Sequence, residues 1–513
     1  MRFIGSSHLL LGYATLGVTA IDTNQQVPIQ DSATKGCATA CSDLAASYPK
    51  QLLIRNTTLY DDFIKTYWSK QQQDISPLCA FKPADANEVA VLVRLAKQTE
   101  CPFAIRSGGH GMAASNVNDG ISVSLENLNE ITVSADKKTV NLGPGNIWSK
   151  VFETLEKDDI AVAGGRFTTV GVGGLITGGG ISFFAPKMGW TCNTVVEYEL
   201  VDPNGKILEV TKSSHPDLFW ALCGAASNFG IVTRFTLETF PLPRGEIWGG
   251  MRISTEGEIP ALLQASYNFG TKGVASDPEG AHILTLALHE GHKLGLAILS
   301  HANPESLGGE APKVMKEFLD LPTIRDSTGV RTVNNLLTEM SYGELEPRRR
   351  KRSTATYRLD LELMHYTKDV CYEEFAKLSD IPNALTLCVF QIITKQQLEV
   401  SAKKGGNPLG LEPEDGPLLL LNTWFTWDDE SFDARIEQAA RIIVEKSVAF
   451  SKGAKRDVDY RYLNYAGEWQ NVIASYGAKN LEKLAAVAEK YDAEGVIKTL
   501  RPAIFSLAGA PIS

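Results

Sequence analysis

A short apolar run opens into a glycine-rich loop at Phe103-Ala104-Ile105-Arg106-Ser107-Gly108-Gly109-His110-Gly111. Pro102 comes just before it, and the apolar residues predict a short strand that ends where the glycines begin. Glycine lets the backbone approach a ligand closely and reach positive φ, so successive N–H groups can point at one anion. The segment therefore predicts a loop suited to a pyrophosphate group.

A second glycine-rich stretch follows a predicted helix over 146–157 and an apolar strand over 160–163. It reads Gly164-Gly165-Arg166-Phe167-Thr168-Thr169-Val170-Gly171-Val172-Gly173-Gly174 and is closed by Gly178-Gly179-Gly180. Neither stretch is a P-loop, since no Gly-Lys-Ser/Thr follows, and neither has the G-x-G-x-x-G of a dinucleotide fold. Tight turns in a crowded sheet would explain either stretch alone, so the glycines by themselves name no cofactor.

The composition is that of a soluble globular protein, with 513 residues, 43% of them hydrophobic and 21% charged. It excludes wholesale disorder, a coiled coil and a multi-span membrane protein. The formal net charge is −10, which repels phosphate backbones, so we expect no nucleic-acid partner. After the first twenty residues no stretch approaches the ~18 apolar residues of a membrane helix, so we expect no membrane partner.

The N-terminus predicts a secretory signal peptide over residues 1–20. Met1-Arg2 supplies a positive charge, a mostly apolar stretch runs over 3–18, and Val18-Thr19-Ala20 offers small residues for cleavage. A buried N-terminal helix is the alternative. A signal peptide implies that the protein is secreted or enters the secretory pathway.

Eight cysteines and one N-glycosylation sequon fit such a compartment. We expect the N-terminal pair, Cys37 and Cys41, to form disulfides with Cys79 and Cys101, although spacing does not fix the connectivity. Asn56-Thr57-Thr58 suits a surface position.

The hydrophobic pattern predicts an α+β fold, because strands and helices alternate irregularly. Before residue 245 it indicates a helix over 87–100 and hairpins within 131–142 and 195–211. Beyond it, long strand-like runs with amphipathic helices predict a separate antiparallel sheet flanked by helices. Those runs are 282–288, 294–300, 385–393 and 418–425, with helices at 431–448 and, near the end, 481–491.

Several motifs together resemble those of a known family. They are Arg106-Ser107-Gly108-Gly109-His110, Val170-Gly171-Val172-Gly173-Gly174, Gly178-Gly179-Gly180, Pro216-Asp217-Leu218-Phe219-Trp220-Ala221-Leu222, Asn228-Phe229-Gly230-Ile231-Val232-Thr233, Tyr462-x-Asn464-Tyr465 and Lys490-Tyr491-Asp492. The chain resembles the berberine-bridge-enzyme-like FAD-linked oxidoreductases of the vanillyl-alcohol-oxidase superfamily, in particular secreted fungal ones.

The resemblance implies a domain plan beyond the signal peptide. It gives an N-terminal helical part (21–72), a two-subdomain PCMH-type FAD-binding domain (73–243), a substrate-binding domain (244–455) and a C-terminal berberine-bridge-like segment that returns to the FAD domain (456–513).

The resemblance also implies which residues hold the cofactor. His110 would be bonded covalently to the flavin 8α-methyl group. The other cofactor residues implied are Arg106, Ser107, Gly108, Gly109, Gly111, Gly171, Gly173, Gly174, Gly178, Asn193, Ile231, Val232 and Asn464. Many relatives carry a cysteine with a second flavin linkage where this chain has Phe167, so we expect a single covalent bond and a smaller, less polar substrate.

For the chemistry, the resemblance implies Tyr462 and Tyr465 as the candidate catalytic bases, because members of the family often use a tyrosine near this end of the chain; packing on the flavin is the alternative for both. The expected function is an oxidase that passes a hydride from a small, secondary-metabolite-like substrate to FAD and returns electrons to O2 as H2O2. A carbohydrate (oligosaccharide) oxidase and a flavin-containing cyclase scaffold are the alternatives. The sequence indicates no oligomeric state.

Two other patterns are discounted. His289-Glu290-Gly291-His292 lacks the H-E-x-x-H spacing, so no metal is expected. Arg348-Arg349-Arg350-Lys351-Arg352 is interpreted as a solvated loop.

Overall fold

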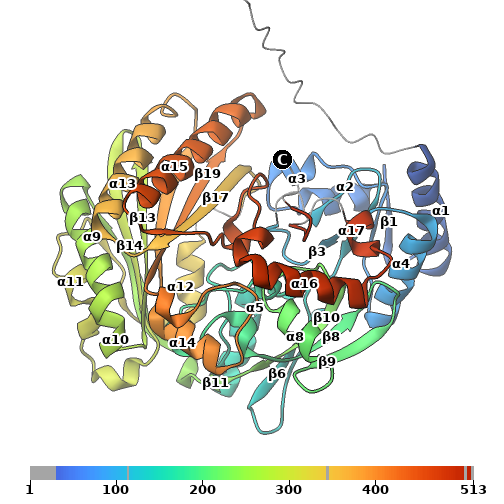
Figure 1. Ribbon diagram of the computed structural model, residues 1–513, viewed down its shortest axis with the longest axis horizontal. Helices are drawn as coiled ribbons and strands as arrows, with labels where there is room; N and C mark the ends of the chain where they lie inside the picture. The colour runs from blue at the N-terminus through green and yellow to red at the C-terminus, as the bar shows by residue number, and fades with distance from the viewer. Residues whose placement is uncertain (1–30, 112–114, 342–345, 502–504, 510–513) are drawn as a thin grey trace, which may run out of the picture.

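The computed structural model describes residues 31–111, 115–341, 346–501 and 505–509, so the predicted signal peptide over 1–20 lies outside the described residues. Helices and mostly antiparallel sheets confirm the α+β class. The largest sheet lies on one side of the molecule with its own helices, and the smaller sheets lie on the other (Figure 1). The domain boundaries given above stay predictions.

The first sheet carries the first glycine loop, which begins where its edge strand β3 (Phe103–Arg106) ends. Its order is β1-β2-β4-β3, and β4 runs parallel to both β2 and β3. The strands are β1 (Leu52–Ile54), β2 (Cys79–Phe81), β3 (Phe103–Arg106) and β4 (Ile121–Ser124). The helix predicted over 87–100 is confirmed as α4 (Ala86–Thr99), which begins where Asp85 accepts a hydrogen bond from the Glu88 N–H.

The second sheet, of order β5-β6-β10-β8-β9, confirms both predicted hairpins. Its strands are β5 (Ile131–Val133), β6 (Thr139–Leu142), β8 (Val195–Val201), β9 (Ile207–Thr211) and β10 (Ile231–Glu238), and β7 (Ile160–Ala161) pairs separately with β11 (Phe240–Pro241). Gly205, with φ of +73°, makes the tight turn between β8 and β9.

The largest sheet has the order β15-β12-β14-β13-β18-β19-β17-β20, with β16 also paired to β12. Its strands are β12 (Glu246–Ser254), β13 (Gly280–His289), β14 (His292–His301), β15 (Arg325–Asp326), β16 (Gly329–Thr332), β17 (Arg349–Arg358), β18 (Leu385–Ile393), β19 (Leu418–Trp427) and β20 (Asp457–Val458). This confirms the predicted antiparallel sheet.

Side chains of this sheet alternate between two environments, as the pleat requires. On β19, Leu419, Leu421 and Phe425 face a core shared with the covering helices. Those helices are α9 (Ile259–Asn268), α13 (Leu361–Ala376) and α15 (Asp433–Gly453) (Figure 1). The alternate residues of β19, Asn422 and Trp424, instead face the smaller sheets and line a cavity.

The interpretation of the arginine run as a solvated loop is wrong. All but its first residue lie in β17, where Arg350 is 1% exposed and Arg352 is 8% exposed. The period of the strand turns Lys351 toward α15, where it pairs with Glu437. Arg350 and Arg352 point to the opposite face and stack on the Trp68 ring, which supports these buried cations.

The end of the chain returns to the smaller sheets. Helix α16 (Ala478–Tyr491) packs on α8 (Pro216–Leu222), and α17 (Val496–Leu500) packs on α4 (Figure 1). The remaining α-helices are α1 (Asp31–Ser47), α2 (Thr58–Lys65), α3 (Lys70–Gln73), α5 (Trp148–Leu155), α6 (Val172–Thr177), α7 (Ala185–Met188), α10 (Val274–Ser276), α11 (Lys316–Leu319), α12 (Val333–Met340) and α14 (Lys395–Lys403).

Disulfides tie α1 to the first sheet and bridge two other regions. Both predicted partners of the N-terminal pair are confirmed. The bridges are Cys37–Cys101, Cys41–Cys79, Cys192–Cys223 and Cys371–Cys388, which leaves no free cysteine in the described chain. Among these same residues, no helix is both long and apolar enough to cross a membrane.

Candidate functional site

A cavity of about 890 Å³ lies where the two glycine loops, the inner face of the largest sheet and the C-terminal segment meet. Its volume is at the upper end of the range for small-molecule and cofactor sites. Most of the residues predicted to form the site line it. They are Ser107, Gly108, Gly109, His110, Gly111, Gly171, Gly173, Gly174, Ile231, Val232, Tyr462, Asn464 and Tyr465.

The two glycine loops touch each other through their backbones. A β-carbon on Gly108 would lie 2.3 Å from the backbone nitrogen of Gly171, so a larger residue would force the loops apart. Ser107 links them, because its Oγ donates to the Pro144 carbonyl and accepts a bond of 3.2 Å from the Gly173 N–H. The loops, distant in sequence, thus form one wall of the cavity.

Room remains beside this wall. A β-carbon at Gly174 would meet no other atom within 4 Å, although Gly174 lines the cavity. Gly109 has φ of +74°, a conformation that favours glycine. Close contact at one position and open space at another are the features expected of a loop that cradles a ligand.

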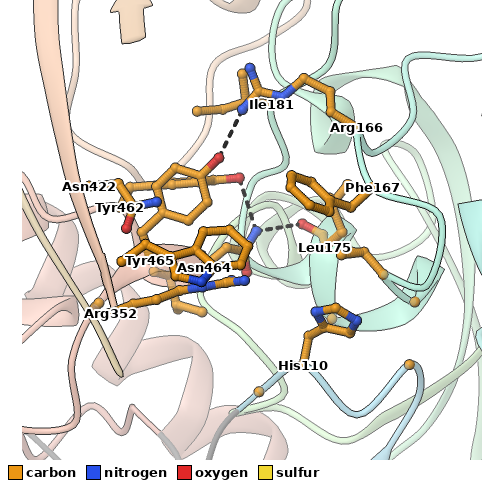
Figure 2. Close-up of a pocket in the computed structure, with 18 of the residues that line it drawn as sticks. His110, Arg166, Phe167, Leu175, Ile181, Arg352, Asn422, Tyr462, Asn464 and Tyr465 are labelled. Carbon is orange, nitrogen blue, oxygen red and sulfur yellow. Dashed lines mark hydrogen bonds between the residues drawn. The ribbon is translucent and has the colours of Figure 1, made fainter. Parts of the chain in front are cut away.

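His110 projects from the first loop into the cavity (Figure 2). Its Nε2 lies 2.9 Å from Thr169 Oγ1, and its ring stacks on Trp68 with centroids 4.3 Å apart. Its Nδ1 is buried and has no hydrogen-bond partner among the described residues. Burial, and then the positive charges of Arg352 and Arg350, hold the pKa of His110 well below its usual value, so the imidazole is neutral.

Arg106 is not brought to the cavity. Its guanidinium lies against the rings of Phe63 and Tyr67, 4.9 and 4.3 Å from their centroids, and donates to the Thr66 carbonyl. Because strand β3 alternates, this side chain points behind the loop and braces it from outside.

Gly178 and Asn193 also lie outside the cavity lining. A β-carbon on Gly178 would be 2.1 Å from Asn464 Oδ1, so the glycine makes room for that side chain. Asn193 donates to the Gly406 carbonyl and accepts from Asn407, so it joins two loops.

The two candidate bases differ in their surroundings. Tyr462 is 1% exposed, and its Oη accepts hydrogen bonds from Asn464 Nδ2, at 3.0 Å, and from the Ile181 N–H. Asn464 Nδ2 also donates to the Leu175 carbonyl, so Tyr462 holds Asn464 against the second glycine loop (Figure 2). Burial raises the pKa of Tyr462 well above 10, which disfavours its phenolate.

Tyr465 is half-buried, and its Oη accepts two hydrogen bonds at the cavity wall. Arg166 Nη2 donates at 2.8 Å and Gln391 Nε2 at 3.2 Å. A negative charge on this oxygen would be met by the positive charge of Arg166. The geometry therefore distinguishes the two tyrosines, because the Tyr465 hydroxyl is held by Arg166 and Gln391 at the cavity wall, whereas Tyr462 positions Asn464.

Several polar residues of the cavity were not predicted as site residues from the sequence, namely Arg166, Gln391, Asn422 and Arg352. A sequence signal exists for two of them, because Gln391 and Asn422 place amide side chains at inward positions of strands made mostly of apolar residues. Arg352 could be found only after the arginine run was recognised as a strand.

Phe167 lines the cavity and packs on Trp424, with centroids 5.5 Å apart. It offers no thiol. Each described cysteine is already in a disulfide, so none is available for a second attachment near this position.

Comparison with known proteins agrees with this geometry. Residues 77–211 match the FAD binding domain family FAD_binding_4. The FAD-dependent monooxygenase FUP4 of Fusarium proliferatum is 35% identical over 451 residues, covering 85% of this chain and 86% of that protein.

Solved structures share the fold. Berberine bridge enzyme from Eschscholzia californica superposes with a TM-score of 0.74 at 16% identity, covering 93% of this chain and 99% of that one. Xylooligosaccharide oxidase from Myceliophthora thermophila C1, in complex with xylobiose, gives 0.73 at 17% identity, covering 91% and 99%.

Proposed function

This chain belongs to the berberine-bridge-enzyme-like FAD-linked oxidoreductases, with a PCMH-type FAD-binding fold, and from this we propose an oxidase with FAD bonded to His110. It would remove a hydride and a proton from a small organic substrate and use O2 as the final electron acceptor. The observation that carries the proposal is His110 Nδ1, a buried nitrogen on a neutral imidazole at the wall of the cavity, which has no hydrogen-bond partner within the described parts of the chain.

The residues present fit FAD. A buried nitrogen without a partner is unfavourable unless a bond completes it, and attachment through Nδ1 would do so. The joined glycine loops leave space at Gly174 for a ligand beside backbone N–H groups. Bound FAD would supply a hydride acceptor, and the chain would supply position and proton transfer. Phe167 leaves His110 as the single attachment point.

We assign the removal of the substrate proton to Tyr465. Its Oη, held by Arg166 and Gln391, would take the proton of a substrate hydroxyl or amine. Asn464, fixed by Tyr462 and the Leu175 carbonyl, would orient the bound groups without exchanging a proton. Tyr462 is buried and Tyr465 is half-buried, so the proton transfer would be partly shielded from bulk water.

A monooxygenase is the second candidate, because the FUP4 relative is named as one. The two reactions differ in the source of their electrons and in the fate of the oxygen atoms. An oxidase transfers two electrons and two protons from substrate to O2, giving H2O2. A monooxygenase places one atom of O2 in the product and the other in water, and its extra two electrons come from a donor such as NAD(P)H.

The experiment supplies purified holoprotein with a panel of small phenols, alcohols and acids, with and without NADPH, under ¹⁸O2. For an oxidase we expect substrate oxidation without NADPH, H2O2 equal to product, and no ¹⁸O in a product formed by dehydrogenation. An NADPH requirement with one ¹⁸O per product would replace the oxidase proposal with a monooxygenase.

The same assay separates the remaining alternatives. Peroxide release with xylo- or cello-oligosaccharides, but not with small aromatic substrates, would indicate a carbohydrate oxidase. Product formed while flavin absorbance never bleaches under anaerobic conditions would indicate a cyclase scaffold. A small-molecule oxidase bleaches with its substrate and recovers its colour in air.

We also propose that the protein is secreted and glycosylated. Asn56 is exposed and begins the sequon, and the disulfides suit an oxidising compartment. Expression in a fungal host should place the protein in the medium, with a mature N-terminus after Ala20 and a mass that falls on endoglycosidase treatment. Retention inside the cell with an intact Met1 would contradict this.

A further inference from the structure

The strongest unassigned feature of the cavity is Arg352. Its side chain is 8% exposed, and its guanidinium carbon lies 3.9 Å from the ring centroid of Trp424 and 4.5 Å from that of Trp68. Its Nε is buried without a hydrogen-bond partner, and it forms no ion pair within the part of the chain that the structure describes. Burial lowers the pKa of Arg352 to about 10, so the group stays charged at neutral pH.

The carboxylates on the cavity wall do not form ion pairs with Arg352 within the described residues. Glu339 is paired with Arg325 and Arg331, and Glu468 is paired with Lys351. Glu339 is shared by two arginines, and the lysine that holds Glu468 also pairs with Glu437, so neither cavity carboxylate forms an ion pair with Arg352 among the described residues. A buried charge without a counter-ion is unfavourable, and an anion entering the cavity would relieve it.

The surroundings of Arg352 are aromatic. Trp68 and Trp424 meet edge to face with centroids 6.0 Å apart, and Phe167 packs on Trp424. Trp68 in turn stacks on His110. The guanidinium therefore lies between two flat indole rings, and one of these rings also contacts the proposed attachment residue, His110. A guanidinium edge pairs in plane with a delocalised oxyanion, and indole faces favour a flat partner.

We propose that Arg352 binds the anionic group of the substrate, which makes the substrate class flat, conjugated oxyanions such as aromatic carboxylates or acidic phenols and enols. This rests on the proposed function, since it takes the cavity to be where substrate enters. A neutral sugar offers Arg352 no charge, so the same feature disfavours the carbohydrate alternative. Arg352 comes from the largest sheet and not from the glycine loops that we assign to FAD.

The test is ligand binding to the holoprotein, which needs no turnover. Benzoate and its neutral counterpart benzamide are titrated while the flavin absorption spectrum is followed. We expect benzoate to bind about 10- to 100-fold more tightly than benzamide, as for a hydrogen bond to a charged group in a buried site. Titration of 4-nitrophenol above and below its own pKa distinguishes a phenolate from a carboxylate as the preferred anion.

Variants assign the effect to Arg352. Arg352→Gln should abolish the preference for benzoate, and Arg352→Lys should keep part of it, because the charge remains but the planar fork is lost. Arg358→Gln is the matched control, since it removes the same charge from an exposed side chain on the same strand. It should bind both ligands as the unaltered protein does.

Three outcomes would overturn the inference. The first is equal binding of benzoate and benzamide to the unaltered protein. The second is an anion preference that survives in Arg352→Gln. The third is a flavin absorption spectrum that differs between Arg352→Gln and the unaltered protein before any ligand is added, which would show that Arg352 contacts FAD instead. The first outcome is measured on the unaltered protein, so it does not depend on whether a variant folds. Because each readout is binding, an absence of oxidase activity would count against the proposed function and leave the anion preference measurable.

Discussion

The imidazole of His110 lies stacked on the indole of Trp68, with centroids 4.3 Å apart and planes inclined by 24°. This contact and the bond to Thr169 hold the ring from two sides and leave Nδ1 without a hydrogen-bond partner among the residues that the structure describes. Attachment of a cofactor depends on such orientation, because a covalent bond forms readily only when the reacting atoms are held in line.

Replacing His110 should release the flavin on denaturation. After acid precipitation we expect the unaltered protein to keep its yellow colour in the pellet, and His110→Ala to lose it to the supernatant while its circular dichroism stays unchanged. His289→Ala is the control, since His289 also lines the cavity but is exposed. Colourless pellets from the unaltered protein would refute the linkage.

Weakening the contact between Trp68 and His110 should slow the covalent attachment of flavin. An aromatic pair is worth about 0.5–1.5 kcal/mol, so Trp68→Leu should incorporate covalent flavin about threefold to tenfold more slowly than the unaltered protein. The measurement adds FAD to flavin-free protein and follows in-gel flavin fluorescence with time. Trp68→Phe should keep most of the rate, and an unchanged rate in Trp68→Leu would show that Thr169 alone orients the ring.

Tyr465→Phe should lower the rate of flavin reduction by substrate about 10²- to 10⁴-fold, the usual contribution of a general base. Its pH–rate profile should also lose the limb that reports the base. Tyr462→Phe keeps the buried ring and lacks an ionising group, so we expect little change in that limb. If Tyr462→Phe removes the limb and Tyr465→Phe does not, the two roles are reversed.

Stability should fall in acid because of His282, which is buried against Ser266. Burial lowers its pKa from 6.5 to about 3, so between these values the unfolded chain binds a proton that the folded chain does not. The stabilisation is therefore present above pH 6.5 and is lost as the pH falls. From pH 7 to 5 the loss is about 2 kcal/mol.

The check for His282 is urea unfolding at pH 7 and pH 5. His282→Gln can still hydrogen-bond Ser266 but does not titrate, so its free energy of unfolding should fall by about 2 kcal/mol less than that of the unaltered protein. Equal losses in both proteins would show that other groups carry the acid dependence.

Local patterns anticipated much of this molecule. The loop at Gly109, the hairpin turn at Gly205 and the helix predicted over 87–100 follow from backbone conformation and hydrophobic periodicity, which act over a few residues. The pairing of Cys37 and Cys41 with Cys79 and Cys101 was also anticipated. The assignment to FAD came from motifs shared with a family, because glycine loops alone fit several ligands.

The composition of the site was decided by tertiary structure. Tyr465 and Arg166, 299 residues apart, form a hydrogen bond because the C-terminal segment returns across the second glycine loop. The charge of Arg352 became a cavity feature only once β17 was seen to be a strand with an inner face. Periodicity and turn chemistry are local and readable from sequence, whereas contacts between distant residues depend on how the largest sheet packs against the loops.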